Sequence, residues 1–339
     1  MRFPKAAAVL AVAALAAACG GSSDAAGKPT TLHLGYFPNL THASALYGVA
    51  SGTYARELGT TKLETETFNA GPAEVEALFA GSIDAAYIGP GPAVNAFLKS
   101  RGAVVLVAGA TSGGAALVVR PGITSLHKGL TIADPQTGGT QDIALRTYLE
   151  GLGLGVDEQG NGPVQIQVED NAQTLDQFKA GKIDGAWVPE PWASRLVVEG
   201  KGTVLVDERS LWPGGQFVTT NLLVRAEFLD NHPDVVTALI KAQVAANQEI
   251  AADPAKAKTV INAALKSITG KALKPEVLDR AFGELTFTVD PLASSLQEIA
   301  DHAFATKLLK KASLKGIYDL RLLESVTGKT YDTAGLGKG

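Results

Sequence analysis

The chain has 339 residues, a formal net charge of −4 and a single cysteine. One cysteine excludes a disulfide within the chain, so the fold must be held together by its core. The basic residues are scattered, which is a poor arrangement for nucleic-acid binding because phosphate contacts need clustered Lys and Arg. Beyond the N-terminal segment, about 310 residues remain, enough for two domains of ordinary size.

The first residues have the layout of an export signal. Arg2 and Lys5 precede an apolar run over 6–18, which is shorter than the roughly 20 residues of a membrane-spanning helix. The run ends at Cys19 in a context that resembles the lipobox of bacterial lipoproteins, although leucine stands four residues before the cysteine rather than three. We expect a lipoprotein signal over 1–19, a flexible tether over 20–30 and a lipid anchor on Cys19 outside the cytoplasm, in the periplasm or on the outer face of the cell membrane. The alternative is a secreted protein that loses Cys19 with its signal.

From Thr31 onward, short apolar runs alternate with helical patterns. The first series predicts strands and helices in turn over 32–36, 41–58, 62–68, 72–80, 83–88, 92–100 and 104–108. The second series predicts them over 130–133, 140–152, 164–168, 175–180, 183–188 and 191–199. Such alternation favours parallel sheets covered by helices. After Pro233 the chain is mostly helical to about Leu323, and we expect these helices to pack on the first series.

One segment is nearly repeated one hundred positions later. AGSIDAAYIGPGPA (80–93) and AGKIDGAWVPEPWA (180–193) are identical at six of fourteen positions. Each copy ends a helix at Ala-Gly, opens a strand at Ile-Asp and turns into a new helix, with the glycine supplying the left-handed helix stop. The repeat predicts two similar lobes; chance similarity between two common α/β units is the alternative. AALVVR (115–120) and TTNLLVR (219–225) also echo each other and are the expected crossings between the lobes.

Ligands of open α/β sheets bind where strands lead into helix N-termini, and these N-termini favour anions. At the first such corner, Asn39 and His42 bring two polar side chains to one helix mouth, although Asn39 or Thr41 alone would fit a helix cap. At the second, Gly89 lets a ligand approach the backbone closely. Ser112 lies in a small polar run that also fits a simple turn.

The segment DPQTGGTQD (134–142) follows a predicted strand and opens a long helix. It has no lysine after its glycines and lacks the Walker spacing, so it is not a nucleotide P-loop. It predicts an anion-binding corner in which the Thr140 hydroxyl and the Gln141 amide stand beside free backbone N–H groups. A helix that is merely capped is the alternative.

Two more corners carry unusual side chains. Trp187 and Glu190 lie in WVPEPW (187–192), and Thr220 follows WPGG (212–215) near the return crossing. We expect Glu190 at a helix N-terminus, where the helix dipole lowers its pKa. The ionised carboxylate would then accept a hydrogen bond from a donor on an anionic ligand. Alternatively, Glu190 caps its helix or pairs with Arg195.

The residues offer little for catalysis. The sequence has no G-x-S-x-G elbow, no H-E-x-x-H and no paired cysteines, and its five histidines are scattered. A two-lobed shell with polar corners therefore favours binding over turnover. We expect no catalytic residue, no metal and no cofactor.

Six segments together carry a family resemblance: GYFPNLTHASALYG (35–48), LFAGSIDAAYIGPGPAVNAF (78–97), GATSGGAALVVR (109–120), PQTGGTQDIALRTYL (135–149), AWVPEPWASRL (186–196) and WPGGQFVTTNLLVR (212–225). On these segments the chain resembles the solute-binding lipoproteins of bacterial ABC importers, in the nitrate/sulfonate/taurine group. The resemblance implies an α/β type II periplasmic-binding-protein fold, in which two lobes joined by two strand crossings close on a ligand. It places lobe I over 31–117 and 222–330, lobe II over 118–221 and a polar tail over 331–339.

The resemblance also implies the ligand and the partners. The ligand is a small organic anion, an aliphatic sulfonate or a taurine-like compound, with nitrate or a thiamine-pyrimidine-type precursor as alternatives. The receptor is a monomer that docks on a membrane permease driven by a separate ATPase. No arginine falls in the corners, so neutral donors would hold the anion. The implied ligand-binding residues are Asn39, His42, Gly89, Ser112, Thr140, Gln141, Trp187, Glu190 and Thr220.

Two other functions stay open on the same fold. Pyrimidine synthases of yeast-type thiamine biosynthesis use a cysteine-rich motif and a lysine-bound pyridoxal phosphate. The sole cysteine of this chain, Cys19, lies ahead of the fold, and this weighs against such an enzyme, as does the export signal. A ligand sensor that signals to a membrane kinase would carry the same sequence features as a transport receptor.

Overall fold

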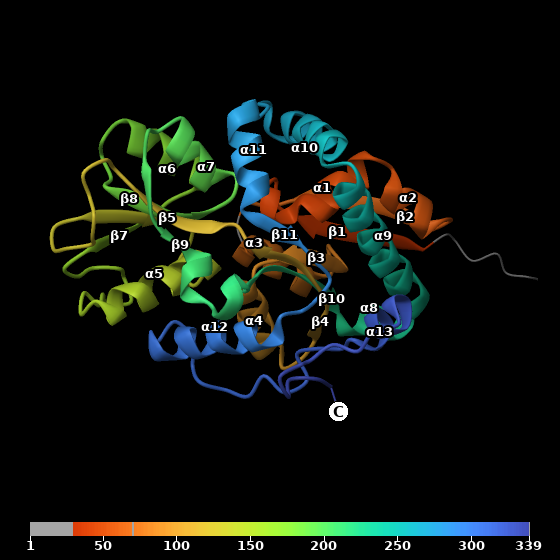
Figure 1. The fold of residues 1–339 in the computed structure, drawn as a ribbon. Coiled ribbons are helices and arrows are strands. Elements are labelled where there is room, and N and C mark those ends of the chain that lie inside the picture. Colours follow the sequence, from red (N-terminus) through yellow and green to blue (C-terminus); the bar gives the residue numbers. More distant parts are fainter. Residues whose placement is uncertain (1–29, 70, 339) are drawn as a thin grey trace, which may run out of the picture.

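Two separate sheets form the framework of the protein (Figure 1). The computed structural model describes residues 30–69 and 71–338, so the expected lipoprotein signal, with Cys19, and nearly all of the tether lie outside the described residues. The first sheet has the order β11-β4-β10-β3-β1-β2, and the second has the order β7-β6-β8-β5-β9. Each sheet with its helices makes one lobe, which confirms the two-lobed α/β fold expected from the sequence.

The strands of the first sheet are β1 (Thr31–Tyr36), β2 (Lys62–Thr67), β3 (Ala85–Ile88), β4 (Val104–Gly113), β10 (Val218–Arg225) and β11 (Leu285–Phe287). Those of the second are β5 (Ala115–Val119), β6 (Thr131–Asp134), β7 (Gln165–Val168), β8 (Gly185–Pro189) and β9 (Thr203–Asp207). In both sheets one central strand, β3 or β8, is parallel to the strand on one side and antiparallel to the strand on the other. The two sheets therefore repeat one arrangement.

The helices of lobe II are α5 (Thr140–Gly151), α6 (Asn171–Lys179) and α7 (Trp192–Val198). The N-terminal part of lobe I has a 3-10 turn η1 (Leu40–His42), α1 (Ala43–Ala50), α2 (Thr53–Leu58), α3 (Gly71–Ala80) and α4 (Pro90–Ser100). Its C-terminal part has α8 (Ala226–Asn231), α9 (Pro233–Ala252), α10 (Pro254–Thr269), α11 (Pro275–Gly283), α12 (Ala293–Ala305) and α13 (Arg321–Thr327). Within the described residues, no helix is both long enough and apolar enough to cross a membrane.

The chain crosses between the lobes a few residues before the positions expected from the sequence. The first crossing is at Gly113 and Gly114, which both have a φ of 76° and separate β4 from β5. The second runs over 208–217 through the short turns η2 (Glu208–Leu211) and η3 (Pro213–Gly215). The expected segments 115–120 and 219–225 are instead strand β5 with Arg120 and nearly all of strand β10, each within one sheet. Their resemblance arises because they hold the same place in the two sheets, beside the repeated central strand.

The aspartate of the repeat performs the same task in both lobes. The Asp84 Oδ2 atom accepts a hydrogen bond from the His33 backbone N–H at 3.0 Å, and the Asp184 Oδ2 atom accepts one from the Thr131 N–H at 2.9 Å. The backbone N–H of each aspartate donates back to the carbonyl of the same partner, at 2.8 Å in both cases. Each pair therefore ties the start of the central strand to the start of its parallel neighbour.

An arginine completes this arrangement from the antiparallel neighbour. The backbone N–H of Arg225 donates to the Asp84 carbonyl at 3.0 Å, and that of Arg120 donates to the Asp184 carbonyl at 2.9 Å. The Arg120 Nη1 atom also donates to the Gly181 carbonyl at 2.9 Å, where α6 has just ended. The repeat is therefore a shared structural device and not a chance similarity.

The C-terminal helices cover lobe I and also reach lobe II. Helices α9 and α10 pack on α1, as expected, whereas α11 contacts α7 and α12 contacts α5 across the cleft (Figure 1). Strands β9 and β11 were not predicted, and the predicted helix over 41–58 is divided into η1, α1 and α2. Gly52, with a φ of 79°, separates α1 from α2.

Removal of the Asp184 carboxylate should destabilise lobe II. Asp184→Ala leaves the Thr131 N–H without its acceptor, and we expect a loss of about 1–3 kcal/mol in the free energy of unfolding. Urea unfolding followed by the fluorescence of the buried Trp187 measures this loss. Asp176→Ala, an exposed aspartate on α6, is the matched control. Equal stability of the two variants would contradict the role given to Asp184.

Candidate functional site

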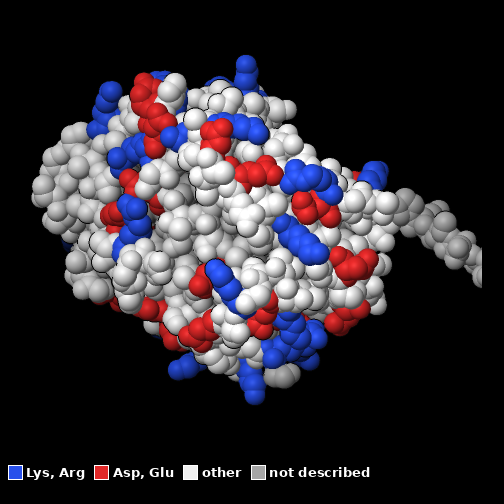
Figure 2. Space-filling model, turned by 45° about the vertical axis from the view of Figure 1, so that its right-hand side comes forward, with Lys and Arg blue, Asp and Glu red and all other residues white. Residues whose placement is uncertain are grey.

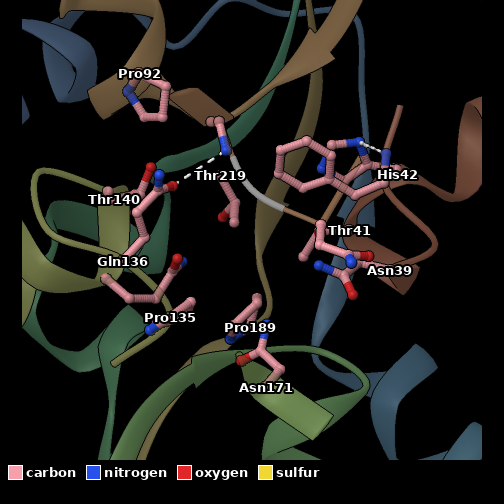
Figure 3. Close-up of a pocket in the computed structure, with 16 residues that line it drawn as sticks. Asn39, Thr41, His42, Pro92, Pro135, Gln136, Thr140, Asn171, Pro189 and Thr219 are labelled. Carbon is pink, nitrogen blue, oxygen red and sulfur yellow. Dashed lines mark hydrogen bonds between the residues drawn. The ribbon is translucent and has the colours of Figure 1, made fainter. Parts of the chain in front are cut away.

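A polar pocket lies between the two lobes (Figure 3). Its cavity volume is about 50 Å³. Lobe I contributes Phe37, Asn39, Thr41, His42, Asn69, Gly71, Gly89, Pro92 and Thr219. Lobe II contributes Pro135, Gln136, Gly139, Thr140, Gln141, Asn171 and Pro189. In Figure 3, His42, Thr41 and Asn39 lie opposite Thr140, Gln136 and Pro135, with Asn171 at the edge nearest Pro189. We call this cavity the inner pocket.

Four helices begin at the inner pocket. Helices α3 and α4 start at its lobe I side, and helices α5 and α6 start at its lobe II side. The N-cap residues of α4 and α5 are Gly89 and Gly139, and that of α6 is Asp170; none of them caps its helix with a side chain. Gly139 provides no capping side chain, so the first-turn N–H groups of α5 have no side-chain cap and can face a ligand. In the first turn of α4, by contrast, Pro90 and Pro92 have no N–H, and the Gly91 N–H donates to the Thr140 Oγ1 atom at 3.4 Å, so α4 contributes mainly its dipole. Converging helix N-termini make this an anion-binding geometry.

The inner pocket has this anion-binding geometry without ionised side chains in its described lining. None of the described residues that line it is Lys, Arg, Asp or Glu. The donors include backbone N–H groups, the Thr140 hydroxyl, side-chain amides and the neutral ring of His42. On the outside of the molecule, basic and acidic side chains are interspersed over the face in Figure 2 rather than gathered into one field. An anion in this pocket would therefore be bound by dipoles and not by a counter-charge.

His42 is a neutral donor in this pocket. Its Nδ1 atom accepts a hydrogen bond from the Phe37 backbone N–H at 3.2 Å, and its ring stacks on Phe37 with 4.6 Å between ring centroids. Burial lowers the pKa of His42 from 6.5 to about 3. With Nδ1 occupied as an acceptor, the single proton of the neutral ring lies on Nε2. His42 can therefore offer one N–H to a ligand without adding charge.

Carboxylates behind the pocket hold the loop over 134–142 in shape. The Asp134 Oδ1 atom accepts from the Gln136 N–H at 2.8 Å, and the Asp142 Oδ2 atom accepts from the Gly138 N–H at 2.7 Å. Asp142 is in turn paired with the buried Arg146, whose Nε lies 2.6 Å from Oδ1. Burial, and secondarily the neighbouring Asp142, raise the pKa of Asp134 well above its ordinary value. The loop is therefore held in one conformation before a ligand binds, and its charged side chains lie outside the pocket.

The glycines of the second corner serve the contact between lobes. A Cβ atom on Gly89 would lie 2.6 Å from the Thr140 Oγ1 atom, and one on Gly91 would lie 2.8 Å from the Ile143 Cδ1 atom. Their small size therefore lets α5 approach α4 closely. The Gly71 N–H also donates to the Gln136 Oε1 atom across the cleft at 3.1 Å, so the lobes are closed on each other (Figure 3).

Five of the nine residues expected to bind ligand line the inner pocket: Asn39, His42, Gly89, Thr140 and Gln141. The structure does not bring the other four there, for identifiable reasons. Ser112 accepts a hydrogen bond from the Phe217 N–H at 3.3 Å and thereby ties β4 to the second crossing. Thr220 is fully buried, because register shifts at the start of β10 turn Thr219 toward the pocket instead.

Trp187 is a core residue of lobe II. Alternate residues of a strand point to opposite faces, so Trp187 faces α5 while Val188 faces α6 and α7. Its side chain is fully buried, and its Nε1 atom donates to the Glu208 Oε2 atom at 2.7 Å. It packs in the core rather than at the inner pocket.

Glu190 fits the alternative of a helix cap. Its Oε2 atom accepts from the Ser194 N–H at 3.0 Å, and its Oε1 atom accepts from the Ser194 hydroxyl at 2.9 Å, in the first turn of α7. The expected lowering of its pKa is wrong: burial raises the pKa of Glu190 to about 7, although the bonds from Ser194 act in the opposite direction. Desolvation outweighs the helix dipole because Glu190 is only 2% exposed. Arg195 pairs with Glu199 instead.

Sequence reasoning missed several lining residues, among them Asn69, Gln136 and Asn171. Asn69 lies between β2 and α3, and Asn171 is the first residue of α6, so the rule that pointed to Asn39 could also have found them. The Asn171 Oδ1 atom is buried and has no hydrogen-bond partner among the described residues. An acceptor left free in this way marks a place where a ligand could offer a donor.

The neutral state of His42 has a measurable consequence. Its pKa is about 3 in the fold and 6.5 as the ordinary value, so the unfolded chain gains this proton first as the pH falls. The stability that His42 contributes is complete above pH 6.5 and is lost progressively below it, by roughly 3 kcal/mol at pH 4. We expect His42→Gln to lose less stability between pH 7 and pH 4 than the parent protein does. Urea titrations at the two pH values measure this, with the exposed His127→Gln as control; a parallel loss in all three proteins would contradict the buried neutral state.

Comparison with known proteins identifies the family of the chain. Residues 25–265 match the model of the NMT1-like family. The taurine-binding periplasmic protein of Escherichia coli K12 is 30% identical over 208 residues, which cover 60% of this chain and 62% of that protein. The chain thus spans 62% of the length of this relative and 54% of the length of a putative binding protein of Brucella abortus.

Two solved structures share the fold. The alkanesulfonate-binding protein of Xanthomonas axonopodis pv. citri has a TM-score of 0.69 at 22% identity, covering 84% of this chain and 96% of its own. The nitrate-binding protein of Synechocystis PCC 6803 has a TM-score of 0.71 at 19% identity, covering 84% of each chain. At these identities the likeness concerns the fold. Because the family model spans more than two thirds of the sequence, the chain belongs to the NMT1-like family.

Proposed function

We propose that the protein is the extracytoplasmic solute-binding receptor of an ABC importer and that it captures a small organic anion between its lobes. The observation that carries this proposal is the convergence of four helix N-termini on one pocket whose described lining is uncharged. Such a site can bind an anion through helix N-termini. The protein then avoids the free-energy cost of burying a charged side chain as a partner for the anion. The taurine-binding relative supports the same role. In this role the receptor performs no chemical step.

We further propose a sulfonate as the anionic group, with a hydrogen-bond donor elsewhere on the ligand. The sulfonate oxygens would accept from the first turn of α5, including the Thr140 hydroxyl, and from His42 Nε2. The free Asn171 Oδ1 atom would accept the donor, such as the ammonium of taurine. Nitrate, the ligand named for one structural neighbour, could occupy the same donors but would leave Asn171 unpaired. The donor-reading role first assigned to Glu190 thus falls to Asn171.

Delivery would depend on movement of the lobes about the two crossings. In the structure the lobes are joined by Leu40 N–H to the Glu190 carbonyl at 3.1 Å and by the Gly71–Gln136 bond. A ligand that binds both lobes stabilises this closed form by mass action. The closed receptor would then dock on a permease driven by a separate ATPase, and opening would release the anion.

Thr140 provides a direct test of the anion site. We expect taurine or ethanesulfonate to raise the melting temperature of the protein with increasing concentration, and Thr140→Ala to weaken calorimetric binding about 10-fold, since the hydroxyl is a donor at the pocket. Thr147→Ala, in the same helix and away from the pocket, is the matched control and should bind as the parent does. If taurine, alkanesulfonates and nitrate all fail to bind the parent, the proposed function is wrong.

Anchoring is a separate part of the proposal. Cys19 would become the lipidated N-terminus, so the full chain should partition with membranes in a bacterial host, and Cys19→Ser should release it or leave its precursor uncleaved. Fractionation and mass spectrometry of the mature N-terminus measure both effects. A protein found only in the soluble fraction, with a mature N-terminus other than Cys19, would contradict the anchor.

A further inference from the structure

The interlobe cleft continues outward from the inner pocket through two larger cavities. The middle chamber, of about 410 Å³, shares Phe37, Asn39, Asn69 and Asn171 with the inner pocket. The outer chamber, of about 570 Å³, shares Pro38, Ala172, Trp192 and Thr269 with the middle one. The three cavities therefore follow one another along the same cleft, between α6 and α7 on one side and the end of α10 on the other.

The inner pocket is too small for a whole organic ligand. A buried water needs roughly 10–15 Å³ of such volume, so about 50 Å³ takes about four water-sized groups, the size of a sulfonate group alone. The carbon atoms attached to that group must then lie in the middle chamber. This chamber presents the side chains of Phe37, Phe68, Trp192 and Ile268, and it has Asp170 and Asn171 on its lobe II wall. Its chemistry suits a short apolar chain with a donor.

Trp192 lies where the middle chamber meets the outer chamber, and it does not line the inner pocket. It is the first residue of α7 and lines both the middle and the outer chamber. Its Nε1 atom donates to the Asn39 Oδ1 atom at 3.0 Å, which is a hydrogen bond from lobe II to lobe I. The Arg195 guanidinium lies over one face of the indole, 4.6 Å from the ring centroid. The indole is thus fixed across the cleft in the closed form.

We propose that Trp192 is the residue that determines ligand length, because its indole forms the end wall of a tail subsite in the middle chamber. This inference rests on the proposed function, in which the anionic group occupies the inner pocket. A tail that ends before the indole is buried between Phe37 and Phe68, whereas a longer tail must displace the Trp192–Asn39 bond and prevent full closure. The outer chamber is then closed to the tail in the parent protein.

The test measures the affinity of a series of linear 1-alkanesulfonates, from methane- to decanesulfonate, by calorimetry. In the parent protein we expect affinity to rise by up to about fourfold per methylene while the tail fills the middle chamber, and then to stop rising or to fall. In Trp192→Ala the rise should continue for at least two further methylenes, into the outer chamber. Methanesulfonate should bind both proteins within a few-fold, because its atoms do not reach the indole.

Two further variants separate the wall from the bond and from the surroundings. Trp192→Phe keeps an aromatic wall but loses the donor to Asn39, so we expect the same length limit and dissociation about fivefold faster. Lys179→Ala, which lines only the outer chamber, should change all affinities uniformly and leave the length limit unchanged. Melting temperatures without ligand establish that each variant is folded.

The outcomes distinguish this proposal from the proposed function. Sulfonate binding with the same length limit in the parent and in Trp192→Ala would overturn the role of Trp192 while leaving the receptor function intact. Affinity that does not depend on chain length in the parent would overturn the tail subsite. No binding of any sulfonate to the parent would overturn the function and this inference together.

Discussion

The close contact between the N-terminus of α4 and that of α5 is the constraint on which the site depends. Gly89 and Gly91 leave room for Thr140 and Ile143, so two helices from different lobes can point their first turns into one small volume. A side chain on either glycine would push the two lobes apart. The first turns of α4 and α5 would then no longer face the same small volume. The backbone of the closed form therefore creates the pocket, and the side chains refine it.

The protein keeps charge close to this pocket but out of it. The Asp142–Arg146 pair lies outside the pocket and holds the loop over 134–142 in its conformation. The carboxylate of Glu190 is hydrogen-bonded to Ser194 in the first turn of α7. His42 is held neutral by burial. A pocket of fixed dipoles discriminates by the number and direction of donors rather than by net charge, which agrees with the proposed role of a receptor. For the same reason, the buried carboxylates of Asp134, Asp142 and Glu190 serve to hold backbone N–H groups in place.

Much of the architecture could be predicted from the sequence because it rests on local patterns. The α/β alternation and the repeat over 80–93 and 180–193 identified two similar lobes, and the search for strand ends found five residues that line the pocket. The remaining errors concern features that depend on tertiary structure. The register shifts in β10 exchange Thr220 for Thr219, and the pleat of β8 sends Trp187 into the core. The pKa of Glu190 depends on a burial that no local pattern reveals.

The order of strands has a consequence for how the chain matures. Lobe II is one uninterrupted segment, from β5 to β9, whereas the sheet of lobe I takes β10 between β3 and β4 only after all of lobe II has emerged. During synthesis, lobe II can thus acquire its complete sheet while lobe I still lacks a central strand, with the edges of β3 and β4 unpaired. Strand β10 enters between them and β11 follows at the outer edge. Lobe I therefore completes its sheet last, and the incomplete lobe I sheet, with unpaired strand edges, is the state most exposed to aggregation.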